Sequence, residues 1–279
     1  NYSFIRIQKH VAMATISGSE GPRTYVWGNF QDYYEIRNGQ GQDPRLPWLR
    51  DIVDWRGAEV LDLGCNSGAL TLQLAQEGAS VLGVDIDPTL ILQARAARQA
   101  DAAVPGRAKF LCRDMMKLRL RRTYDVVLLL STSKWVHLQH GDQGLQALFL
   151  RIRRWLRPAG VFILEPQPWK AYKKVADAWA DVEETWRSIR LRPAQFVDFL
   201  TQEVKFEAEH RWVHIDHVVE SFQRTIYFLW KPDVKRVTAG GVLKRRGTRT
   251  RHRLLRFAAA LRDAKKKRKQ REKKRKKMG

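Results

Sequence analysis

Residues 60–68 read Val-Leu-Asp-Leu-Gly-Cys-Asn-Ser-Gly, and this stretch decides the fold of the 279-residue chain. Its first four residues are typical of a buried strand, and Gly64 and Gly68 then let the backbone turn tightly and approach a ligand. A helix is expected over Ala69–Gln76, and a second apolar strand over Val81–Val84 leads directly into Asp85. This order is typical of the nucleoside-binding half of an α/β fold.

Short apolar strands and helical stretches continue to alternate after this unit. Further strands are expected over Lys109–Cys112, Tyr124–Leu130 and Val161–Leu164, with helices over Leu90–Ala100 and Leu145–Leu156 between them. Such alternation favours a mostly parallel sheet with helices on both faces.

The pattern changes in the last third of the chain. A helical stretch over Tyr172–Ile189 and a helix over Pro193–Leu200 precede two strands, Arg211–His217 and Thr225–Trp230, joined by a short link. We therefore expect an antiparallel pair at one edge of the sheet. The predicted fold class is α/β, with a mostly parallel sheet and an antiparallel C-terminal edge.

Positive charge is distributed unevenly along the chain. The net charge is +23, yet residues 235–279 contain 21 Lys and Arg against two acidic residues, which leaves only +4 for residues 1–234. We expect a flexible lead-in over residues 1–24, a folded domain over residues 25–234 and a largely disordered basic tail over residues 235–279. Such a tail favours a polyanion, most plausibly nucleic acid. The tail has two interpretations. It is either a nuclear localisation signal or non-specific RNA clamp, or it makes a sequence-specific contact.

Several classes of protein are disfavoured. Cys65 and Cys112 are the two cysteines, which provide neither a disulfide framework nor metal-ligand spacing, so we expect no metal. The longest apolar run, Val126–Leu130, is too short to span a bilayer. The residues after Asn1 lack the apolar core of a secretory signal. We expect a soluble intracellular protein with no membrane partner.

The glycine turn and three carboxylates favour a particular ligand. The turn lacks the second glycine of G-x-G-x-x-G, so the close approach to a pyrophosphate is missing. Asp62, Asp85 and Asp114 lie near the carboxyl ends of parallel strands, where ligands bind. This set favours S-adenosylmethionine, with Asp85 accepting from the ribose hydroxyls and Asp114 and Met115 beside the adenine. For Asp62, a role as a cap or loop brace is an equal alternative.

The segment after the fourth strand is expected to face the methyl acceptor. Residues 131–137 read Ser-Thr-Ser-Lys-Trp-Val-His, without the Asn/Asp-Pro-Pro-aromatic pattern of base-amine methylation. The cation Lys134, the indole of Trp135 and the imidazole of His137 suit an anionic oxygen attached to a stacked base. Core packing of Trp135, and a capping or core role of His137, are the alternatives.

A second polar segment follows the fifth strand and reads Leu164-Glu165-Pro166-Gln167-Pro168-Trp169. Its two prolines fix an extended loop beside the same edge of the sheet. Glu165 and Gln167 can then be aimed at a substrate with little loss of entropy. A purely structural rigid turn is the alternative.

Six blocks of sequence together resemble one known family. They are Gly28-Asn29-Phe30 with Tyr33-Tyr34 and Arg37-Asn38, Leu61 to Gly68, Asp85-Ile86-Asp87, Ser133-Lys134-Trp135-Val136-His137-Leu138, Gly141-Asp142-Gln143-Gly144-Leu145, and Leu164 to Trp169. In this order they resemble the bicoid-interacting, methylphosphate-capping family of RNA methyltransferases over roughly residues 25–232. The Lys-Trp-Val-His-Leu and Glu-Pro-Gln-Pro-Trp blocks are far more specific than the glycine turn.

The resemblance implies a fold, a reaction and partners. The fold would be a class I, Rossmann-like methyltransferase sheet of seven strands, and S-adenosylmethionine would be converted to S-adenosyl-L-homocysteine. The acceptor would be the 5′ terminal phosphate of a small non-coding RNA: the γ-phosphate in the capping branch, which this chain resembles more, or a monophosphate in a related branch. We expect a nuclear monomer that holds the RNA's 5′ end and adjacent hairpin, with other ribonucleoprotein components.

Matching positions imply three sets of site residues. The cofactor set, with Gly68 added from the same turn, is Arg37, Gly64, Cys65, Asn66, Gly68, Asp85, Ile86, Asp114, Met115 and Leu130. The RNA set from matching positions is Asn29, Phe30, Tyr33, Tyr34, Lys134, Trp135, Glu165, Gln167 and Trp169. The family does not generally have such a basic tail, so Lys265, Lys266, Lys267 and Arg268 are added to this set from their charge alone. The catalytic candidates Lys134, His137 and Arg37 would hold phosphate oxygens. An acceptor that is already anionic requires no general base.

Departures from the family pattern keep a second function open. Trp27 and Phe30 stand where tyrosines are expected, and Asp114-Met115 stands where an Asn-Tyr pair is usual. The alternative is a binding subunit whose methyltransferase fold holds and stabilises an RNA in a ribonucleoprotein, with catalysis dispensable or lost.

Overall fold

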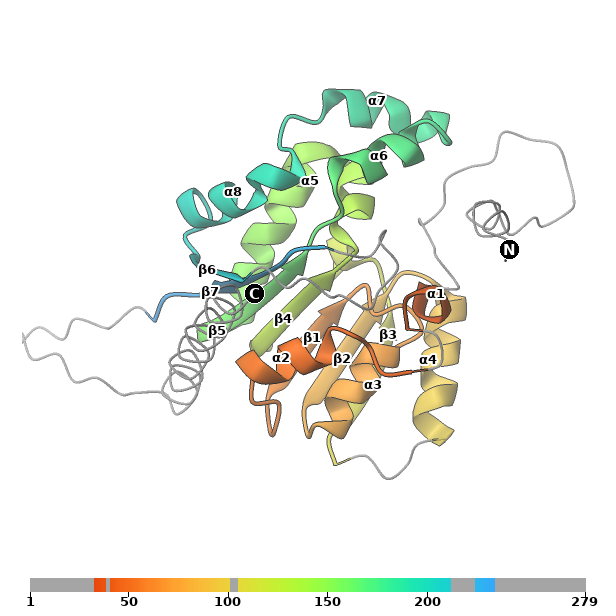
Figure 1. Ribbon diagram of the computed structural model, residues 1–279, viewed down its shortest axis with the longest axis vertical. Coiled ribbons are helices and arrows are strands. Elements are labelled where there is room, and N and C mark those ends of the chain that lie inside the picture. Colours follow the sequence, from red (N-terminus) through yellow and green to blue (C-terminus); the bar gives the residue numbers. More distant parts are fainter. Residues whose placement is uncertain (1–32, 39–40, 101–104, 212–223, 234–279) are drawn as a thin grey trace, which may run out of the picture.

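The computed structural model describes residues 33–38, 41–100, 105–211 and 224–233, and its strands form one seven-stranded sheet in the order β3-β2-β1-β4-β5-β7-β6 (Figure 1). The strands are β1 (Glu59–Leu63), β2 (Ser80–Asp85), β3 (Arg107–Cys112), β4 (Tyr124–Leu130), β5 (Leu156–Glu165), β6 (Glu207–Arg211) and β7 (Ile226–Trp230). Strands β1 to β5 are parallel, and β7 is antiparallel to both β5 and β6. The predicted fold class is confirmed.

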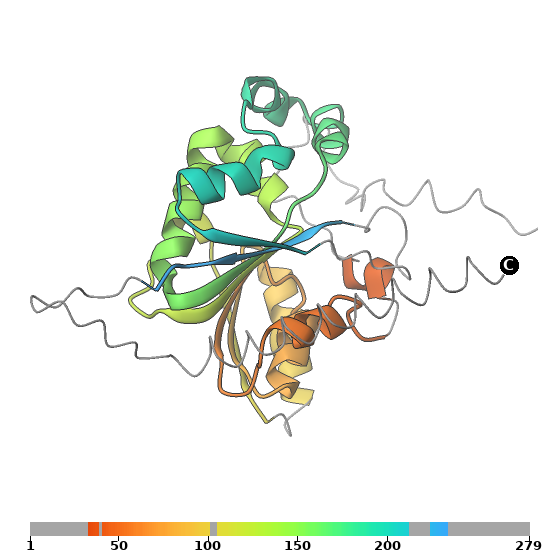
Figure 2. The same ribbon diagram turned by 60° about the vertical axis from the view of Figure 1, so that its left-hand side comes forward.

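Helices cover both faces of this sheet, as the edge-on view in Figure 2 shows. On one face Val60 packs in a core with α2 (Leu46–Ile52) and α3 (Ala69–Gln76), and α4 (Pro88–Ala100) packs against Phe110 of β3. On the other face Leu61 packs in a core with α5 (Ser133–Trp155) and α8 (Phe196–Gln202). Because neighbouring strand residues point to opposite faces, β1 contributes to both cores. Its continuous apolar run is typical of a strand buried on both sides.

The remaining elements lie near the carboxyl ends of the parallel strands. They are α1 (Tyr33–Asn38), α6 (Trp169–Ala176), α7 (Ala180–Ser188) and the 3₁₀ turns Met115–Lys117 and Pro193–Gln195. Thus both polar segments of the sequence, after β4 and after β5, reach the same edge of the sheet. In an open α/β sheet this edge is where ligands bind.

Backbone geometry explains the glycine turn after β1. Gly64 has φ +77° and an added Cβ would lie 2.4 Å from Thr132 Oγ1, so a side chain would clash with the segment after β4. Gly68 has φ +80°, and its Cβ would lie 2.7 Å from the ring of Phe110. Gly64 therefore brings the turn against the neighbouring strand end, whereas Gly68 allows the turn to pack closely on β3.

The structure differs from the sequence-based elements in several places. The strand expected over Val161–Leu164 is the longer β5, which spans Leu156–Glu165. The helix expected over Leu145–Leu156 is part of the longer α5, which begins at Ser133 and has a non-helical residue at Gly141. The helical stretch expected over Tyr172–Ile189 is divided between two helices, α6 and α7, and the first of them begins earlier, at Trp169. The first antiparallel strand was expected over Arg211–His217, but β6 spans Glu207–Arg211 and residues 212–217 lie outside the described residues.

The predicted terminal segments, residues 1–24 and 235–279, also lie outside the described residues. Within the described ranges, no helix is both long and apolar enough to cross a membrane.

Candidate active site at the carboxyl edge of the sheet

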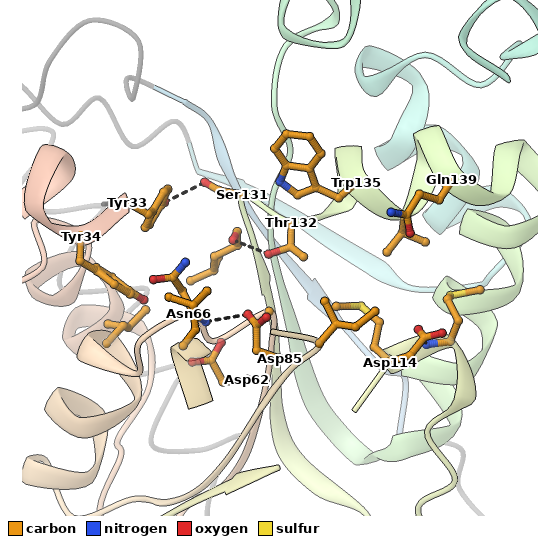
Figure 3. Close-up of a pocket in the computed structure, with 18 of the residues that line it drawn as sticks. Tyr33, Tyr34, Asp62, Asn66, Asp85, Asp114, Ser131, Thr132, Trp135 and Gln139 are labelled. Carbon is orange, nitrogen blue, oxygen red and sulfur yellow. Dashed lines mark hydrogen bonds between the residues drawn. The ribbon is translucent and has the colours of Figure 1, made fainter. Parts of the chain in front are cut away.

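One pocket opens at the carboxyl edge beside β1, β2 and β4, with about 910 Å³ of empty space including its open mouth. Figure 3 shows Ser131 and Trp135 above this space and Asp62 and Asp85 below it. Seven predicted cofactor residues line the pocket, namely Gly64, Asn66, Asp85, Ile86, Asp114, Met115 and Leu130. Tyr33, Tyr34 and Trp135 of the predicted RNA set line it too. The two predicted sets therefore meet in a single cavity.

Asp85 is held in place by backbone donors. Its Oδ2 accepts from the amide of Asn66 (2.8 Å), and its Oδ1 accepts from the amide of Asp87 (3.1 Å). Burial raises the pKa of this carboxyl, while the two amides oppose the shift. Each carboxylate oxygen keeps further acceptor capacity, because a carboxylate has about four lone-pair sites. Asp85 can therefore accept from vicinal hydroxyls such as those of a ribose.

The wall beyond Asp85 is largely apolar. Ile86, Leu90 and Met115 line it, and Asp114 lies at its rim. The Asp114 carboxylate caps the following 3₁₀ turn by accepting from the amide of Met116 (2.7 Å). Apolar walls with a few fixed polar groups suit a flat heterocycle such as adenine. The carboxylates and apolar side chains on this side of the pocket therefore fit the nucleoside half of S-adenosylmethionine.

Three predicted cofactor residues do not line the pocket. Cys65 is 1% exposed, and Gly68 packs against Phe110 and Ala94. Arg37 is buried in an ion pair with Glu165. Their predicted contact with the cofactor remains a prediction, and the observed contacts give each a role in shaping the pocket.

Asp62 serves as a brace and also faces the pocket. The Thr71 hydroxyl donates to its Oδ2 (2.6 Å), which joins β1 to α3, and Asp62 lines the cavity below Tyr34. Burial raises the pKa of Asp62 to about 6. The position of Asp62 is thus compatible with both roles left open by the sequence, contact with the ligand and bracing of the loop.

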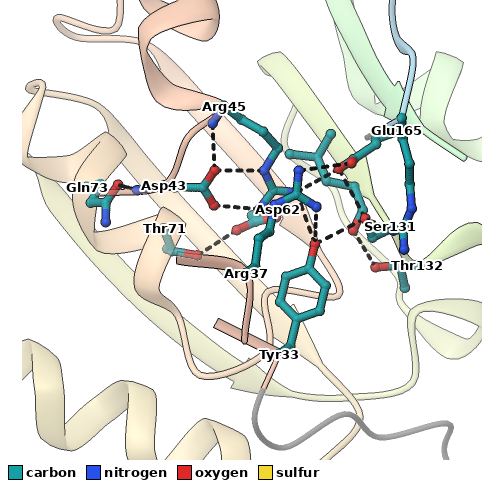
Figure 4. A network of polar contacts seen from close by, with 12 residues as sticks. Tyr33, Arg37, Asp43, Arg45, Asp62, Thr71, Gln73, Ser131, Thr132 and Glu165 are labelled. Atoms are coloured by element: carbon teal, nitrogen blue, oxygen red, sulfur yellow. Dashed lines mark hydrogen bonds and ion pairs between the residues drawn. The ribbon is translucent and has the colours of Figure 1, made fainter. Parts of the chain in front are cut away.

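A buried ion network joins α1 and the start of α2 to the end of β5 (Figure 4). Arg37 donates to Glu165 Oε1 (3.1 Å), and Arg45 donates to Glu165 Oε2 (2.8 Å) and to Asp43 Oδ2 (2.6 Å). Burial alone would raise the pKa of Glu165, but Arg37 and Arg45 hold it below its ordinary value. Because every charge in the network is paired, α1 is fixed over the pocket.

Ser131 connects this network to the pocket. Its hydroxyl accepts from the Tyr33 hydroxyl (3.1 Å) and from Arg224 Nη1 (2.6 Å), and donates to Glu165 Oε2 (3.1 Å). The residue has φ +57°, an uncommon conformation for a side-chain-bearing residue that often marks a functional site. Ser131 belongs to the segment expected to face the acceptor but was not among the predicted site residues, and Arg224 was missed altogether.

Lys134 and Trp135 begin α5 beside Ser131. Lys134 Nζ lies 3.9 Å from the centroid of the Trp135 ring, and Lys134 is 8% exposed. Burial and the charge of Arg224 lower the pKa of Lys134 to about 7. Lys134 does not line the pocket as described, but the indole that it contacts does. An anion beside Trp135 would stabilise the charged form of this lysine.

His137 lies in the core. Its side chain is 0% exposed, Nε2 donates to Asp142 Oδ1 (2.8 Å) and Nδ1 accepts from the Tyr172 hydroxyl (3.3 Å). Asp142 also accepts from the amides of Arg190 and Leu191. Burial lowers the pKa of His137 although Asp142 opposes the shift, so the ring is neutral. With both nitrogens bonded inside the protein, its predicted catalytic role has no support from this position.

Glu165, Gln167 and Trp169 of the predicted RNA set also have internal partners. Gln167 donates to the carbonyl of Ser131 and accepts from the amide of Lys134 (3.3 Å), so it braces the segment after β4. Trp169 stacks on Trp186 with ring centroids 5.7 Å apart. These contacts fit the structural alternative for this loop, while RNA contact stays a prediction. Asn29, Phe30 and the tail residues lie outside the described part of the chain.

No group of three His, Cys, Asp or Glu side chains among the described residues could hold a metal ion. The polar groups of the site are instead spread over the pocket as single carboxylates, hydroxyls and cations.

Fold and pocket together define a class of protein. The strand order, the glycine turn after β1 and the carboxylates after the first three strands are those of a class I S-adenosylmethionine-dependent methyltransferase. A methyltransferase-domain family matches residues 60–160, and the Bicoid-interacting protein 3 (Bin3) family matches residues 124–231. The chain belongs to the Bin3 family, which confirms the resemblance stated from its sequence.

Curated relatives support this assignment. The 7SK snRNA methylphosphate capping enzyme of Mus musculus is 34% identical over 273 residues, covering 74% of this chain and 41% of the relative. The U6 snRNA methylphosphate capping enzyme Amus of Drosophila melanogaster is 34% identical over 226 residues, covering 74% and 75%. The chain therefore spans about two fifths of the length of the mouse relative.

A solved structure agrees on the fold. The N-methyltransferase NodS from Bradyrhizobium japonicum WM9, in complex with S-adenosyl-l-homocysteine, has a TM-score of 0.54 and 11% identity, covering 74% of this chain and 94% of that one. At this identity the likeness concerns the fold alone. The methyltransferase-domain match and the carboxylates that line the pocket support S-adenosylmethionine as the cofactor, as predicted.

Proposed function

We propose that the protein transfers a methyl group from S-adenosylmethionine to the 5′ terminal γ-phosphate of a small non-coding RNA. One observation carries the proposal: Asp85 on the nucleoside side and Ser131 and Trp135 on the other side line the same cavity. The mouse and fruit-fly relatives are both named snRNA methylphosphate capping enzymes. These names favour the γ-phosphate over a monophosphate as the acceptor.

The cofactor would supply an electrophilic methyl group, and the protein's own residues would position the acceptor. A phosphate oxygen is already negative, so no side chain must remove a proton from it. Correct placement of two reactants can lower the barrier by about 7–11 kcal/mol in favourable cases. Lys134 and Arg224 supply positive charge beside Ser131, and Trp135 offers a face for the first base. These residues are our candidates for holding the RNA end.

His137, Arg37 and Glu165 are proposed to act through other residues. His137 joins α5 to Tyr172 of α6, while Arg37 and Glu165 fix α1 against the end of β5. Their buried positions support a role in holding Tyr33, Ser131 and Lys134 in place. This replaces the direct contact with phosphate expected for Arg37 and His137.

Labelled S-adenosylmethionine and three versions of one RNA test the proposal. The RNA would carry a 5′ triphosphate, a 5′ monophosphate or a 5′ hydroxyl. We expect label on the triphosphate RNA and none on the hydroxyl RNA. Label on the monophosphate alone would place the acceptor in the other branch of the family. No label on any end, with tight RNA binding retained, would favour the binding-subunit alternative.

Retention of the methylated RNA is a second part of the proposal. The acceptor side is held by buried ion pairs, so the same rigid groups that position the substrate also fit its product. The protein would then act as a monomer in a nuclear ribonucleoprotein with other proteins, its basic tail adding affinity for RNA. Single-turnover labelling followed by a chase measures this: a burst with slow product release is expected, and steady multiple turnover would contradict retention.

A further inference from the structure

The positive charge of the folded domain is concentrated in one short stretch. Residues 107–122 contain seven Lys and Arg and one acidic residue, a balance of +6, whereas residues 1–234 as a whole carry only +4. The remainder of that region is therefore slightly acidic. A local surplus of this size indicates a polyanionic partner at this surface.

The stretch begins on β3, the strand at one end of the sheet (Figure 1). Arg107 and Lys109 are exposed and alternate with Ala108 and Phe110, which pack on the α4 side. By the two-residue period of a strand, Arg107 and Lys109 share the opposite face with Leu111, which packs against the core beneath α5. Their charges therefore lie on the α5 side of the sheet.

The connection from β3 to β4 continues the same surface. Leu118 is buried, and Leu120 packs against the same core as Leu111. Arg119 and Arg121 alternate with these leucines and are exposed. The connection thus presents a second pair of exposed cations over the same core as the pair on β3.

Helix α5 borders this connection. Arg151 donates to the carbonyl of Met116 (2.6 Å) and to the carbonyl of Leu118, which fixes the connection to the helix. Arg154 lies three residues further along, on the same side of the helix, and is exposed. At the upper end of the surface, Asp114 and Met116 line the pocket. Cations therefore run from the pocket down the side of the molecule.

We propose that Arg107, Lys109, Lys117, Arg119, Arg121 and Arg154, here called the basic strip, bind the phosphate backbone of the RNA stem next to the methylated end. The inference rests on the proposed function and adds a place for the stem. Within the described residues the only ion pair of the strip joins Lys117 and Asp114 at 3.9 Å. Cations without such partners can replace the counterions of a nucleic acid at little cost.

Protection of an exposed strand edge is the main competing explanation. Charged residues on an edge strand prevent pairing with other chains. The opposite edge strand, β6, begins Glu-Ala-Glu, so this sheet also has acidic residues at an edge. Protection of the β3 edge would also not explain why cations lie on the β3–β4 connection and on α5. The position of Arg119, Arg121 and Arg154 therefore favours RNA binding.

A four-site variant of the whole chain tests the strip, with Arg107→Gln, Lys109→Gln, Arg119→Gln and Arg121→Gln. The matched control removes four exposed cations that pair with acids elsewhere, by Arg50→Gln, Arg56→Gln, Lys173→Gln and Arg187→Gln. Two triphosphate-ended RNAs are compared: a short single strand, and the same end followed by a hairpin stem.

For the strip variant we expect about 10- to 100-fold weaker binding of the hairpin RNA. The slope of log Kd against the logarithm of the salt concentration should be smaller by about three to four. Binding of S-adenosylmethionine and methylation of the short strand should match the wild type. Equal hairpin affinity in the strip and control variants would overturn the proposal. Equal loss of affinity for both RNAs would also overturn it, since the stem would then not be the ligand.

A smaller variant guards against effects on the edge strand. Arg119→Gln with Arg121→Gln leaves β3 intact and should produce about half of the change in salt dependence. If this pair has no effect, edge protection explains the charges and the inference fails. If the wild type methylates neither RNA, the proposed function fails, while the comparison of hairpin affinities still tests the strip.

Discussion

The two sides of the pocket are built differently. On the nucleoside side, Asp85 and Asp114 are held by backbone amides and project into the cavity, so their remaining acceptor capacity faces a ligand. On the acceptor side, the polar residues of the motifs mostly bind one another, as Glu165 does with Arg37 and Arg45. A functional motif in a sequence therefore includes residues that contact the ligand and residues that only hold those contacts in place.

Removing the centre of the acceptor-side network should have the largest effect. Glu165→Ala leaves Arg37 and Arg45 buried without their shared carboxylate, which should cost about 3–5 kcal/mol of unfolding free energy. Chemical denaturation measures this against Glu207→Ala, an exposed site on β6. A loss under about 1 kcal/mol, as for surface pairs, would show that the network does not fix α1.

Asp85→Asn should isolate the nucleoside side. The change keeps the size of the side chain but removes its charge and one acceptor, so S-adenosylmethionine should bind about 10- to 100-fold more weakly. RNA affinity should stay within about two-fold, because Asp85 lies across the cavity from Trp135. Titration calorimetry with S-adenosylmethionine and with RNA measures the two affinities separately. An equal loss of RNA binding would contradict the separation of the two sides.

Lys134 should make RNA binding depend on pH. Because burial and Arg224 lower its pKa to about 7, the lysine of the free protein is charged below that pH and loses its charge as the pH rises. Affinity for triphosphate-ended RNA should therefore fall between pH 6 and pH 8, by up to roughly 10-fold. Lys134→Met should bind weakly with little change over this range, whereas Lys134→Arg should bind well throughout. A fall of equal size in the Met variant would assign the effect to another group.

His137→Phe should have the smallest effect on catalysis. The ring is neutral and does not line the pocket, so the change should lower stability by about 1–2 kcal/mol through lost hydrogen bonds. Methyl transfer should fall by less than about 10-fold, with an unchanged pH profile. A general acid–base role would instead cost about 10²- to 10⁴-fold and remove one limb of that profile.

Much of the nucleoside side could be predicted from residues 60–115. Parallel strands end at the same edge, so a glycine turn and an aspartate after successive strands had to meet there. The antiparallel pair was predicted with its first strand displaced, since the alternation around Arg211 does not by itself show where pairing begins. The first part of α5, from Ser133 to the non-helical Gly141, was also not predicted, because the expected helix began only at Leu145.

The acceptor side could not be predicted in the same way. Arg224 donates to Ser131 across 93 residues of sequence, and Arg45 pairs with Glu165 across 120. No local pattern reports such partners. His137 shows the same limit, since its sequence position next to Lys134 and Trp135 suggested the pocket, while the helix turns its ring to Asp142 and Tyr172.

The sequence by itself determined the order of strands and helices, the family, the edge of the sheet where ligands bind and the carboxylates beside the nucleoside. These follow from periodicity and from short motifs, which act over a few residues. Only the tertiary structure decided which polar residues face the cavity and which bind one another. The physical reason is that a buried charge or ring nitrogen must find a partner, and that partner is chosen by packing rather than by proximity along the chain.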